Sequence, residues 1–369
     1  MNKFKQIELE NIIELRKEKY NPLESDINKP CIELEHFDQE TGQINGFIPS
    51  LEQKSIKNVF YKGDVLFGKL RPYLKKYWLA EFDGVCSSEA WVLKPKNNNI
   101  ITKNFLFYLV QSELFIRIAN ISSGSKMPRA DWNYISEYPF SIPPLKEQEK
   151  IAEILLSCDK AIRLTTQIIT QLKQRNQGLT QQLLTGEKSW KKSVLKNIAK
   201  IKKGEQLNVL NLNNKHKYPS YSGGITPSGY TDKYNTEKDT IIISEGGNSC
   251  GYINFIQENF WSGGHCYSIV NSSISKDINK MFLFYFLKKN QEEIMRLRVG
   301  SGLPNIQKRD IELFEIEYPT LTEQNTIAQI LDTAHQELKL YEQKLQLLQE
   351  QKKTLMQKLL TGEVLTVKK

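Results

Sequence analysis

Two long stretches of the chain, 145–187 and 321–363, share one pattern of hydrophobic positions. In both, apolar residues recur at alternating steps of four and three, starting from Ile151 in the first stretch and Ile327 in the second. A mean step of 3.5, kept over about five heptads, predicts helices whose apolar stripe packs along another helix. The alternative interpretation is a helix that packs only on its own domain.

Both predicted helices have clear sequence signals at their ends. Each follows a proline, Pro144 or Pro319, and carries Glu and Gln in its first turn, where negative charge is favourable. Each is expected to end at a glycine, Gly186 or Gly362, because glycine is common just past a helix end. The pattern therefore predicts two separate long helices rather than one.

The two apolar stripes are most simply buried against each other. An antiparallel register in which partner numbers sum to 510 puts Asn176 opposite Ala334 and Lys352 opposite Cys158, so each polar residue meets a small one, with room for water or a snorkelling chain. At ~1.5 Å per residue the helices would form a rod of roughly 60 Å that holds two globular segments at a fixed separation. The predicted seam consists of Ile151, Leu155, Cys158, Ile162, Thr165, Ile169, Leu172, Asn176, Leu179, Leu183, Ile327, Leu331, Ala334, Leu338, Tyr341, Leu345, Leu348, Lys352, Leu355 and Leu359.

The chain is an internal tandem duplication. A shift of 176 positions aligns the two helical stretches without a gap, with 17 identities in 43 positions and LLTGE at both ends. The segment FLFY begins at Phe105 and again at Phe282, and a small-residue loop closes at Pro128 and again at Pro304. Each half is therefore a globular segment followed by a long helix, and the globular segments diverge more than the helices. The predicted divisions are 1–144, 145–187, 188–319, 320–363 and a tail at 364–369.

Composition narrows the kind of partner. The net charge is +9, and residues 188–318 carry 19 Lys and Arg against 13 Asp and Glu, whereas residues 1–144 carry 19 against 18. Such an excess suggests a polyanionic partner, although many proteins without one share it. Five cysteines without a C-x-x-C pair and only four histidines predict reduced thiols and no metal site. The sequence has neither a signal peptide nor an apolar run near ~20 residues, so a cytoplasmic location is expected.

The sequence offers no convincing catalytic centre. The segment GDVLFGK at 63–69 has the glycine and lysine spacing of a phosphate-binding loop, but Leu70 stands where that motif needs Ser or Thr. Its VLF portion also reads as the interior of a strand. There is no G-x-G-x-x-G motif after a predicted strand. There is also no Asn/Asp-Pro-Pro-Tyr/Phe tetrapeptide, the motif of amino-methyltransferases. We expect no catalytic residues, no metal and no cofactor in this chain.

Loops that combine basic and aromatic residues occur in both halves. The stretch 61–78 interleaves lysines and Arg71 with tyrosines, and with Trp78 at its end. Lys and Arg can neutralise phosphates or contact guanine, and Asn or Gln can contact adenine. Taken singly, each residue is more simply a solvated loop residue; the recurrence in both halves favours DNA binding. The candidates are Lys69, Arg71, Tyr73, Lys75, Lys76, Lys126, Arg129, Trp132, Lys202, Lys203, Tyr221, Tyr230, Lys233, Asn305, Lys308 and Arg309.

With its duplicated halves, its L-x-E-Q-x-x-I-A helix starts and its doubled LLTG ends, the chain resembles the specificity subunits of Type I restriction-modification systems. The resemblance covers essentially the whole chain. It implies an α+β fold: two α/β target-recognition domains separated by two long antiparallel coiled-coil helices, related by pseudo-twofold symmetry. It also implies reading of a bipartite double-stranded DNA sequence with an unread spacer. No family list of base-contacting residues carries over to these positions.

The resemblance further implies partners that carry the chemistry. These are two modification subunits with an adenine methyltransferase and its AdoMet, and restriction subunits with ATPase and nuclease activities that use ATP and Mg. Three other interpretations stay open at this point. They are a specificity subunit of a methylation-only or related system, a fused methyltransferase or nuclease, and a coiled-coil adaptor that binds only proteins.

Overall fold

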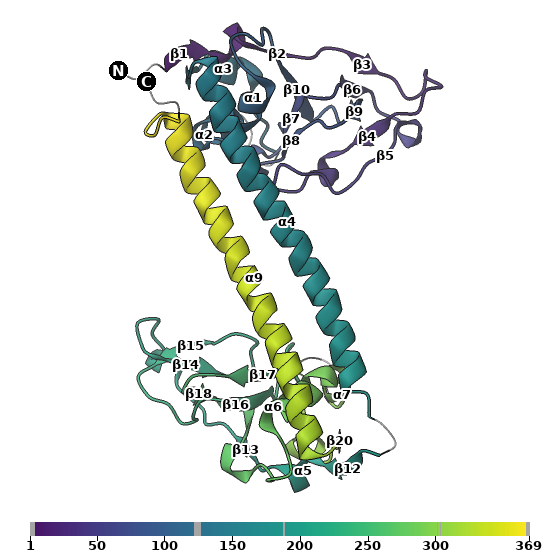
Figure 1. The fold of residues 1–369 in the computed structure, drawn as a ribbon, viewed down its shortest axis with the longest axis vertical. Coiled ribbons are helices and arrows are strands. Elements are labelled where there is room, and N and C mark those ends of the chain that lie inside the picture. The colour runs from purple at the N-terminus through teal and green to yellow at the C-terminus, as the bar shows by residue number, and fades with distance from the viewer. Residues whose placement is uncertain (1–3, 122–126, 187–188, 301, 303, 367–369) are drawn as a thin grey trace. The chain divides into compact units, whose positions relative to one another are not determined.

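A computed structural model describes residues 4–121, 127–186, 189–300, 302 and 304–366 of the chain. It divides into two compact units: unit 1 comprises residues 1–166 and 344–369, and unit 2 comprises residues 167–343. Each unit holds one globular domain and part of each of the two long helices, α4 (Leu145–Leu183) and α9 (Leu321–Thr361). Figure 1 shows the order of the elements along the chain.

The globular domain of unit 1 is built around a four-stranded antiparallel sheet of order β2-β10-β7-β8. A second, five-stranded sheet has the order β3-β6-β9-β4-β5, and β1 pairs with β11. Its strands are β1 (Lys5–Glu8), β2 (Ile13–Leu15), β3 (Lys19–Tyr20), β4 (Pro30–Ile32), β5 (Ile48–Pro49), β6 (Lys57–Phe60), β7 (Val65–Gly68), β8 (Tyr77–Leu79), β9 (Gly84–Cys86), β10 (Ala90–Pro95) and β11 (Pro139–Ile142). Its short helices are α1 (Lys103–Leu109), α2 (Glu113–Ala119) and α3 (Trp132–Ser136).

The globular domain of unit 2 repeats this frame. Its four-stranded antiparallel sheet has the order β13-β19-β16-β17, β12 pairs with β20, and a three-stranded sheet has the order β15-β14-β18. Its strands are β12 (Lys191–Val194), β13 (Ile201–Lys203), β14 (Tyr218–Tyr221), β15 (Gly229–Thr231), β16 (Thr240–Ser244), β17 (Ile253–Ile256), β18 (Trp261–Ser262), β19 (Cys266–Ile269) and β20 (Glu315–Tyr318). Its short helices are α5 (Leu195–Ile198), α6 (Lys280–Lys289), α7 (Gln291–Arg296) and α8 (Lys308–Glu312).

The duplication extends from the helices into the sheets. Gly68 pairs with Ala90 in unit 1, and Ser244 pairs with Cys266 in unit 2, so both members of the pair are shifted by 176 positions. The two FLFY segments lie in α1 and α6, where Phe105 and Phe282 are fully buried in their cores. The second sheets differ in strand number and order, which is where the two domains diverge. The prediction of an α+β chain with an internal duplication is confirmed.

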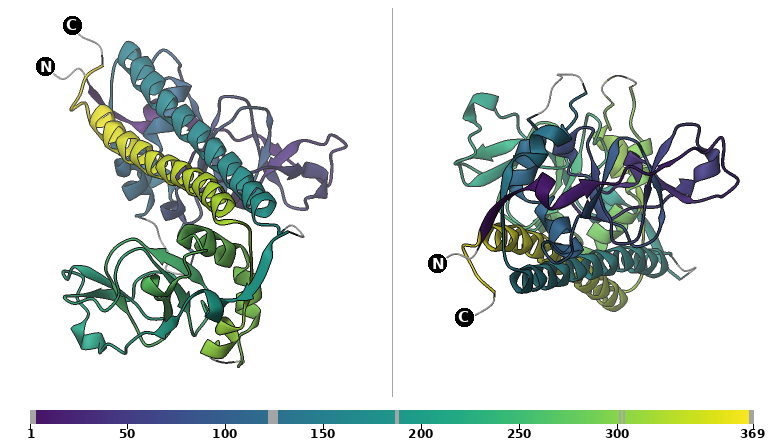
Figure 2. Two further views of the ribbon diagram at one scale, coloured as in Figure 1. Left: turned by 60° about the horizontal axis from the view of Figure 1, so that its bottom comes forward. Right: turned by 90° about the horizontal axis from the view of Figure 1, so that it is seen from above.

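The long helices pair antiparallel, as the seam predicted. In unit 1, near the start of α4 and the end of α9, Lys352 Nζ lies 2.6 Å from Asp159 Oδ1. In unit 2, near the end of α4 and the start of α9, the Asn176 side chain donates to the Ala334 carbonyl at 2.8 Å. The second contact is the one that the predicted register requires. Every residue of the predicted seam is buried or half-buried. Figure 2 shows the two helices from two further directions.

One detail of the helix prediction needs correction. Helix α4 ends at Leu183, not at Gly186. A Cβ at Gly186 would press only on the carboxylate end of the Glu317 side chain, which can move, so the local packing does not demand a glycine there. Gly362 follows α9 directly with φ +74°, the left-handed conformation expected at a helix end. Lys352 lies beside Cys158, as the register predicts, and its chain reaches past this small residue so that its ammonium group pairs with Asp159.

A buried glutamine joins each long helix to its own domain. The Gln148 side chain donates to the carbonyls of Ile100 and Pro143, both at 2.8 Å, and accepts from the Thr102 N–H at 2.9 Å. Gln324, 176 positions later, makes the same three kinds of bond in unit 2, each at 2.9 Å. Both side chains are 0% exposed. The Gln of the repeated Glu-Gln pair is thus a structural bridge, and not only a first-turn residue.

Candidate nucleic-acid interface

In unit 1, backbone hydrogen bonds bring two of the predicted DNA-binding segments together. The turn after β7 carries Lys69 and Arg71, and the loop before α3 carries Arg129. The Arg71 N–H donates to the Pro128 carbonyl at 2.8 Å, and the Ala130 N–H donates to the Lys69 carbonyl at 2.9 Å. The turn and the loop therefore form one continuous surface, although they are far apart in the sequence.

Internal partners hold several of the other basic candidates of unit 1. Lys75 Nζ lies 2.6 Å from Glu40 Oε1, and the Lys76 ammonium donates to the Leu34 carbonyl. Tyr73, on the same turn, is 51% exposed and keeps a free face. This surface therefore offers fewer unpaired charges than the sequence suggests.

The aromatic candidates are mostly part of the core. Trp132 is half-buried and packs edge-on against Trp91 with ring centroids 5.6 Å apart. Tyr77 and Trp78, which the sequence groups with the basic stretch, are 4% and 2% exposed. They cannot stack on bases, so the interpretation of the end of this stretch as an exposed aromatic loop is wrong. Lys126 lies outside the described residues.

The strongest polar feature on this surface is an ion pair that the sequence did not indicate. Arg129 donates from Nε to Glu89 Oε2 at 3.0 Å and from Nη2 to Glu89 Oε1 at 3.1 Å. The hydrogen bond from Arg129 lowers the pKa of Glu89, so this carboxylate is ionised at neutral pH. The Arg129 side chain nevertheless stays 48% exposed. Glu89 thus holds one edge of the guanidinium and leaves the rest accessible.

In unit 2 the candidates divide into two groups. Lys202, Lys233, Lys308 and Arg309 are exposed; of these, Lys202 pairs with Glu205 and Lys308 with Glu312 at the surface. The others are tied more closely to the fold. Tyr221 packs edge-on against Phe260, Tyr230 is 36% exposed on β15, and Asn305 forms backbone bridges to Gly246 and Val299.

A buried carboxylate organises the remaining part of the unit 2 surface. Glu245, only 3% exposed, accepts from Lys203 Nζ at 2.6 Å and from the Tyr267 hydroxyl at 2.8 Å. Burial raises the pKa of Tyr267, which keeps its hydroxyl protonated as a donor. His265 Nδ1 lies 3.6 Å from the other oxygen of Glu245. No local sequence signal points to Glu245 or His265; extending the 176-residue shift pairs them with Lys69 and Glu89.

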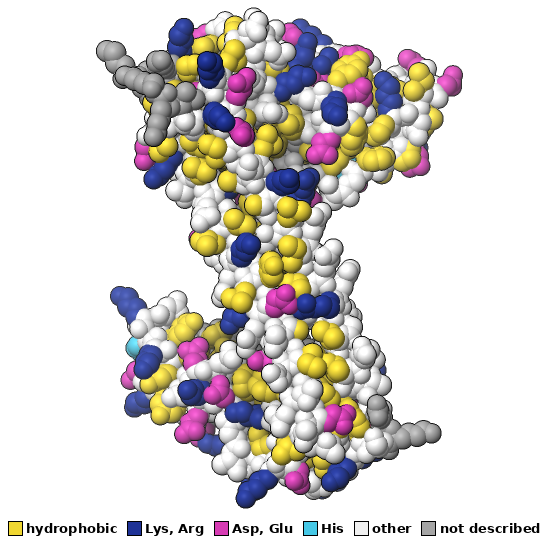
Figure 3. All heavy atoms as spheres, in the orientation of Figure 1, with side chains coloured by type: hydrophobic (Ala, Val, Ile, Leu, Met, Phe, Trp, Pro, Cys, Tyr) yellow, Lys and Arg dark blue, Asp and Glu magenta, His cyan; other side chains and the backbone are white. Residues whose placement is uncertain are grey.

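Outside these candidate surfaces, charged residues of both signs are mixed on the face that Figure 3 shows. Within the described ranges, no three His, Cys, Asp or Glu side chains are grouped as a metal site would require. No helix in the described part of the chain is long and apolar enough to span a membrane.

Comparison with known proteins identifies the family. The sequence model of the Type I restriction modification DNA specificity domain matches residues 1–174 and 187–350, so it finds the domain twice. The chain belongs to this family. It is a Type I specificity subunit with two DNA-recognition domains, one in each unit.

Relatives and solved structures are consistent with this family. A putative type I specificity subunit of Mycoplasma genitalium is 34% identical over 41% of this chain and 39% of its own length. The specificity subunit of the MjaVIII restriction enzyme of Methanocaldococcus jannaschii is 26% identical over 76% of this chain and 74% of its own. The crystal structure of an S subunit from M. genitalium covers 97% of this chain and 96% of its own with a TM-score of 0.72. At 19% identity that likeness establishes the fold alone.

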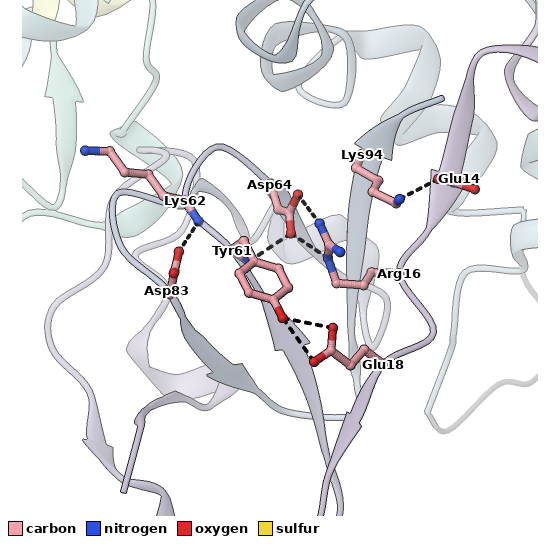
Figure 4. A network of polar contacts seen from close by, with 8 residues as sticks. All are labelled: Glu14, Arg16, Glu18, Tyr61, Lys62, Asp64, Asp83 and Lys94. Carbon is pink, nitrogen blue, oxygen red and sulfur yellow. Dashed lines mark hydrogen bonds and ion pairs between the residues drawn. The ribbon is translucent and has the colours of Figure 1, made fainter. Parts of the chain in front are cut away.

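This specificity subunit contains a second arginine fork, which differs from Arg129 in its surroundings (Figure 4). Arg16 donates to both oxygens of Asp64, at 2.8 and 3.1 Å, just before β7 begins. Its guanidinium also lies 4.6 Å from the centre of the Tyr61 ring. The Arg16 side chain is 20% exposed and Asp64 is 3% exposed. This fork is enclosed and serves the fold, whereas the Arg129 fork lies at the surface beyond the other end of β7.

Proposed function

We propose that this specificity subunit reads a DNA target of two parts, one half-site with each recognition domain. The observation that carries the proposal is the duplicated frame. The sheet register, the glutamine bridge and the long helix are repeated, whereas the outer sheets and the side chains at the surface differ. Two copies of one frame with different surfaces suit two different half-sites.

The same proposal covers the spacer between the half-sites. The helices contain 39 and 41 residues, roughly 60 Å at ~1.5 Å per residue, and within each unit they contact each other in antiparallel orientation. A long antiparallel helix pair between two domains would suit a role in setting the distance between two half-sites. The helices would also carry the docking surface for two copies of a modification subunit, because a repeated sequence offers two similar surfaces.

The chemistry would belong to partner subunits. The modification subunits would supply the adenine methyltransferase with AdoMet, and the restriction subunits would supply ATPase and nuclease activity with ATP and Mg. This chain would contribute recognition and assembly, without catalysis of its own. A complex that contains only modification subunits would use the same recognition chain and would methylate without cutting.

A selection experiment tests the recognition role. The chain, assembled with its modification subunits, is incubated with a duplex library of randomised sequence, and the bound DNA is sequenced at several salt concentrations. We expect a two-part motif with a constant gap and an affinity that falls as salt rises, because phosphate contacts release counterions. Binding without sequence preference would refute the proposal, and the absence of any salt-sensitive, sequence-dependent binding would favour a protein adaptor.

A change in helix length tests the spacer role. One heptad is added to both α4 and α9 at positions opposite each other, which preserves the seam and lengthens the pair by ~10 Å. We expect a wider gap, by about three base pairs at ~3.4 Å per pair, between two unchanged half-sites. An unchanged gap, or altered half-sites, would contradict the role of the helices as a ruler.

A further inference from the structure

The two recognition domains place different side chains on one shared backbone corner. In unit 1 the corner consists of Lys69, Glu89 and Arg129, at the adjoining ends of β7 and β10 and in the loop before α3. The Lys69 N–H donates to the Glu89 carbonyl, and the Ala130 N–H donates to the Lys69 carbonyl, both at 2.9 Å. The corner is therefore held by the backbone, whatever side chains it carries.

The corner of unit 2 has the same backbone bonds and different chemistry. The Glu245 N–H donates to the His265 carbonyl, and the Ile306 N–H donates to the Glu245 carbonyl, again at 2.9 Å. All equivalent positions are shifted by 176, so Glu245, His265 and Asn305 stand where unit 1 has Lys69, Glu89 and Arg129. A fixed backbone with three exchanged side chains is the arrangement that two domains with different base preferences require.

The geometry of Arg129 suits one base in particular. A guanidinium has five N–H donors in a rigid plane, and Glu89 takes one from Nε and one from Nη2. The other three donors have no partner among the described residues, and two of them, one from each terminal nitrogen, lie side by side at the end of the guanidinium. Two parallel donors match the O6 and N7 acceptors of guanine in the major groove.

A phosphate contact is the competing use of this side chain. Arg129 is already neutralised by the Glu89 carboxylate in a two-bond pair, so it attracts a phosphate less than a free arginine does. A carboxylate that fixes the direction of the guanidinium instead helps a contact that depends on direction. The surface location, at 48% exposure, distinguishes this fork from the enclosed Arg16–Asp64 fork.

The corner of unit 2 cannot make the same contact. Its Glu245 faces inward to Lys203 and Tyr267, and the equivalent of Arg129 is an amide, Asn305, whose Oδ1 is buried without a hydrogen-bond partner among the described residues. The most exposed side chain of this corner is His265, at 62%. No guanidinium is present at this position.

We propose that Arg129, held by Glu89, donates to a guanine in the half-site read by unit 1, and that the unit 2 corner makes no such contact. The proposal rests on the DNA-reading function proposed above. It assigns base specificity to Arg129 and a positioning role to Glu89.

The test compares motifs selected from a randomised duplex library by the complex with modification subunits. Arg129→Lys keeps the charge and removes the fork, so we expect preference for one guanine in one half-site to fall about 10–100-fold. The dependence of affinity on salt should stay the same, because the charge is kept. The second half-site should not change.

Two matched variants serve as controls. Arg16→Lys breaks the enclosed fork and should lower the stability of unit 1 without changing the motif. Asn305→Ala, at the equivalent position of unit 2, should leave the guanine preference intact.

A third variant tests the positioning role of Glu89. Glu89→Gln keeps the size of the side chain but removes its charge, so the same guanine preference should weaken while binding to mismatched DNA is kept.

The outcomes separate this inference from the function on which it rests. An unchanged guanine preference in Arg129→Lys would overturn the inference. A wild-type motif without guanine in the half-site read by unit 1 would overturn it as well. A uniform loss of affinity for all sequences in Arg129→Lys would do the same. If the wild-type complex selects no motif at all, the proposed function itself fails. Thermal unfolding of each variant shows whether the fold is intact; if Arg129→Lys does not fold, the Glu89→Gln result decides.

Discussion

The two recognition domains differ at their surfaces and agree where they meet the long helices. Gln148 and Gln324 make equivalent bonds, and both are fully buried. By contrast, the corner that carries Arg129 in unit 1 carries Asn305 in unit 2, and the adjoining sheets have five strands and three. A duplicated chain thus keeps the joint between domain and helix and varies the surface available to a ligand.

The same comparison separates polar residues by role. Polar groups with the same bonds in both units belong to the frame. Exposed polar groups of the globular domains that stand at equivalent positions with different partners are the candidates for recognition. This criterion uses only the internal repeat, and it predicts which paired substitutions have equal effects.

The largest expected effect comes from the buried seam. Leu155 and Leu331 occupy equivalent positions and are 0% and 4% exposed. Leu155→Ala and Leu331→Ala should each destabilise their own unit by about 3–4 kcal/mol, through lost burial and the cavity that remains. Hydrogen exchange resolved by peptide measures the two units separately. A cost below ~1 kcal/mol at either position would show that the helix pair is not part of that core.

The next largest effect comes from the glutamine bridges. Gln148→Ala and Gln324→Ala each leave three backbone groups without their partner, so we expect about 2–3 kcal/mol of lost stability at each joint. The two losses should agree within ~0.5 kcal/mol. Exchange protection at α1 and α6 provides the measurement, with Gln181→Ala on the exposed face of α4 as a neutral control. Clearly unequal losses would break the equivalence of the two joints.

A smaller effect should distinguish the two ends of the helix pair. Lys352 and Asp159 form an ion pair with 12% and 18% exposed side chains, and Tyr108 also donates to Asp159 at 2.7 Å. Lys352→Met should cost about 1–2 kcal/mol in unit 1, because it leaves the carboxylate without its cation. A double-mutant cycle with Asp159→Asn should recover about 1 kcal/mol of that cost. Additive losses in the cycle would mean that the pair contributes nothing.

The seam and its register were predictable, whereas the joint was not. An apolar stripe with two polar interruptions, Asn176 and Lys352, admits few registers in which both interruptions meet small residues. Gln148 gave no such signal, because its partners are backbone groups of Ile100 and Thr102, reached only after the domain folds. In sequence it looked like an ordinary polar residue of a first helical turn.

The candidate surface was predicted in outline and missed in its key contact. Arg129 was identified from its loop, but Glu89 lies 40 positions earlier, and nothing local links the two. Tyr77 and Trp78 were misassigned because aromatic residues between lysines resemble an exposed loop. Strand β8 is instead covered on both sides at these residues, so alternation along the strand did not show which side chains face water.

The smallest predicted effect is a difference in pH dependence. Burial lowers the pKa of Lys288 in α6 to about 8, from the ordinary value of 10.5. Its ammonium stays close to the Tyr252 ring, 3.7 Å from the centroid, and donates to the Ile253 carbonyl at 2.8 Å, which limits the effect. Between pH 8 and 10.5 the folded unit 2 binds fewer protons than the unfolded chain, so its stability should rise with pH.

Lys288→Gln removes this titration, so the stability of unit 2 should rise less steeply with pH in the variant than in the wild type. At the corresponding place after FLFY, unit 1 has the uncharged Gln111. The melting temperature of wild type minus that of the variant should increase by about 2–4 °C between pH 8 and 10. Every other lysine titrates in both proteins, so the difference isolates Lys288. A constant difference across this range would show that Lys288 is charged in the folded state.

The central claim is that two domains on one duplicated frame read two separate half-sites. The most direct test replaces residues 188–318 with the corresponding segment of another family member and maps the DNA motif of the assembled complex. The account predicts that one half-site changes to that of the donor, while the other half-site and the gap stay as they were. A change in both half-sites, or in neither, would contradict it.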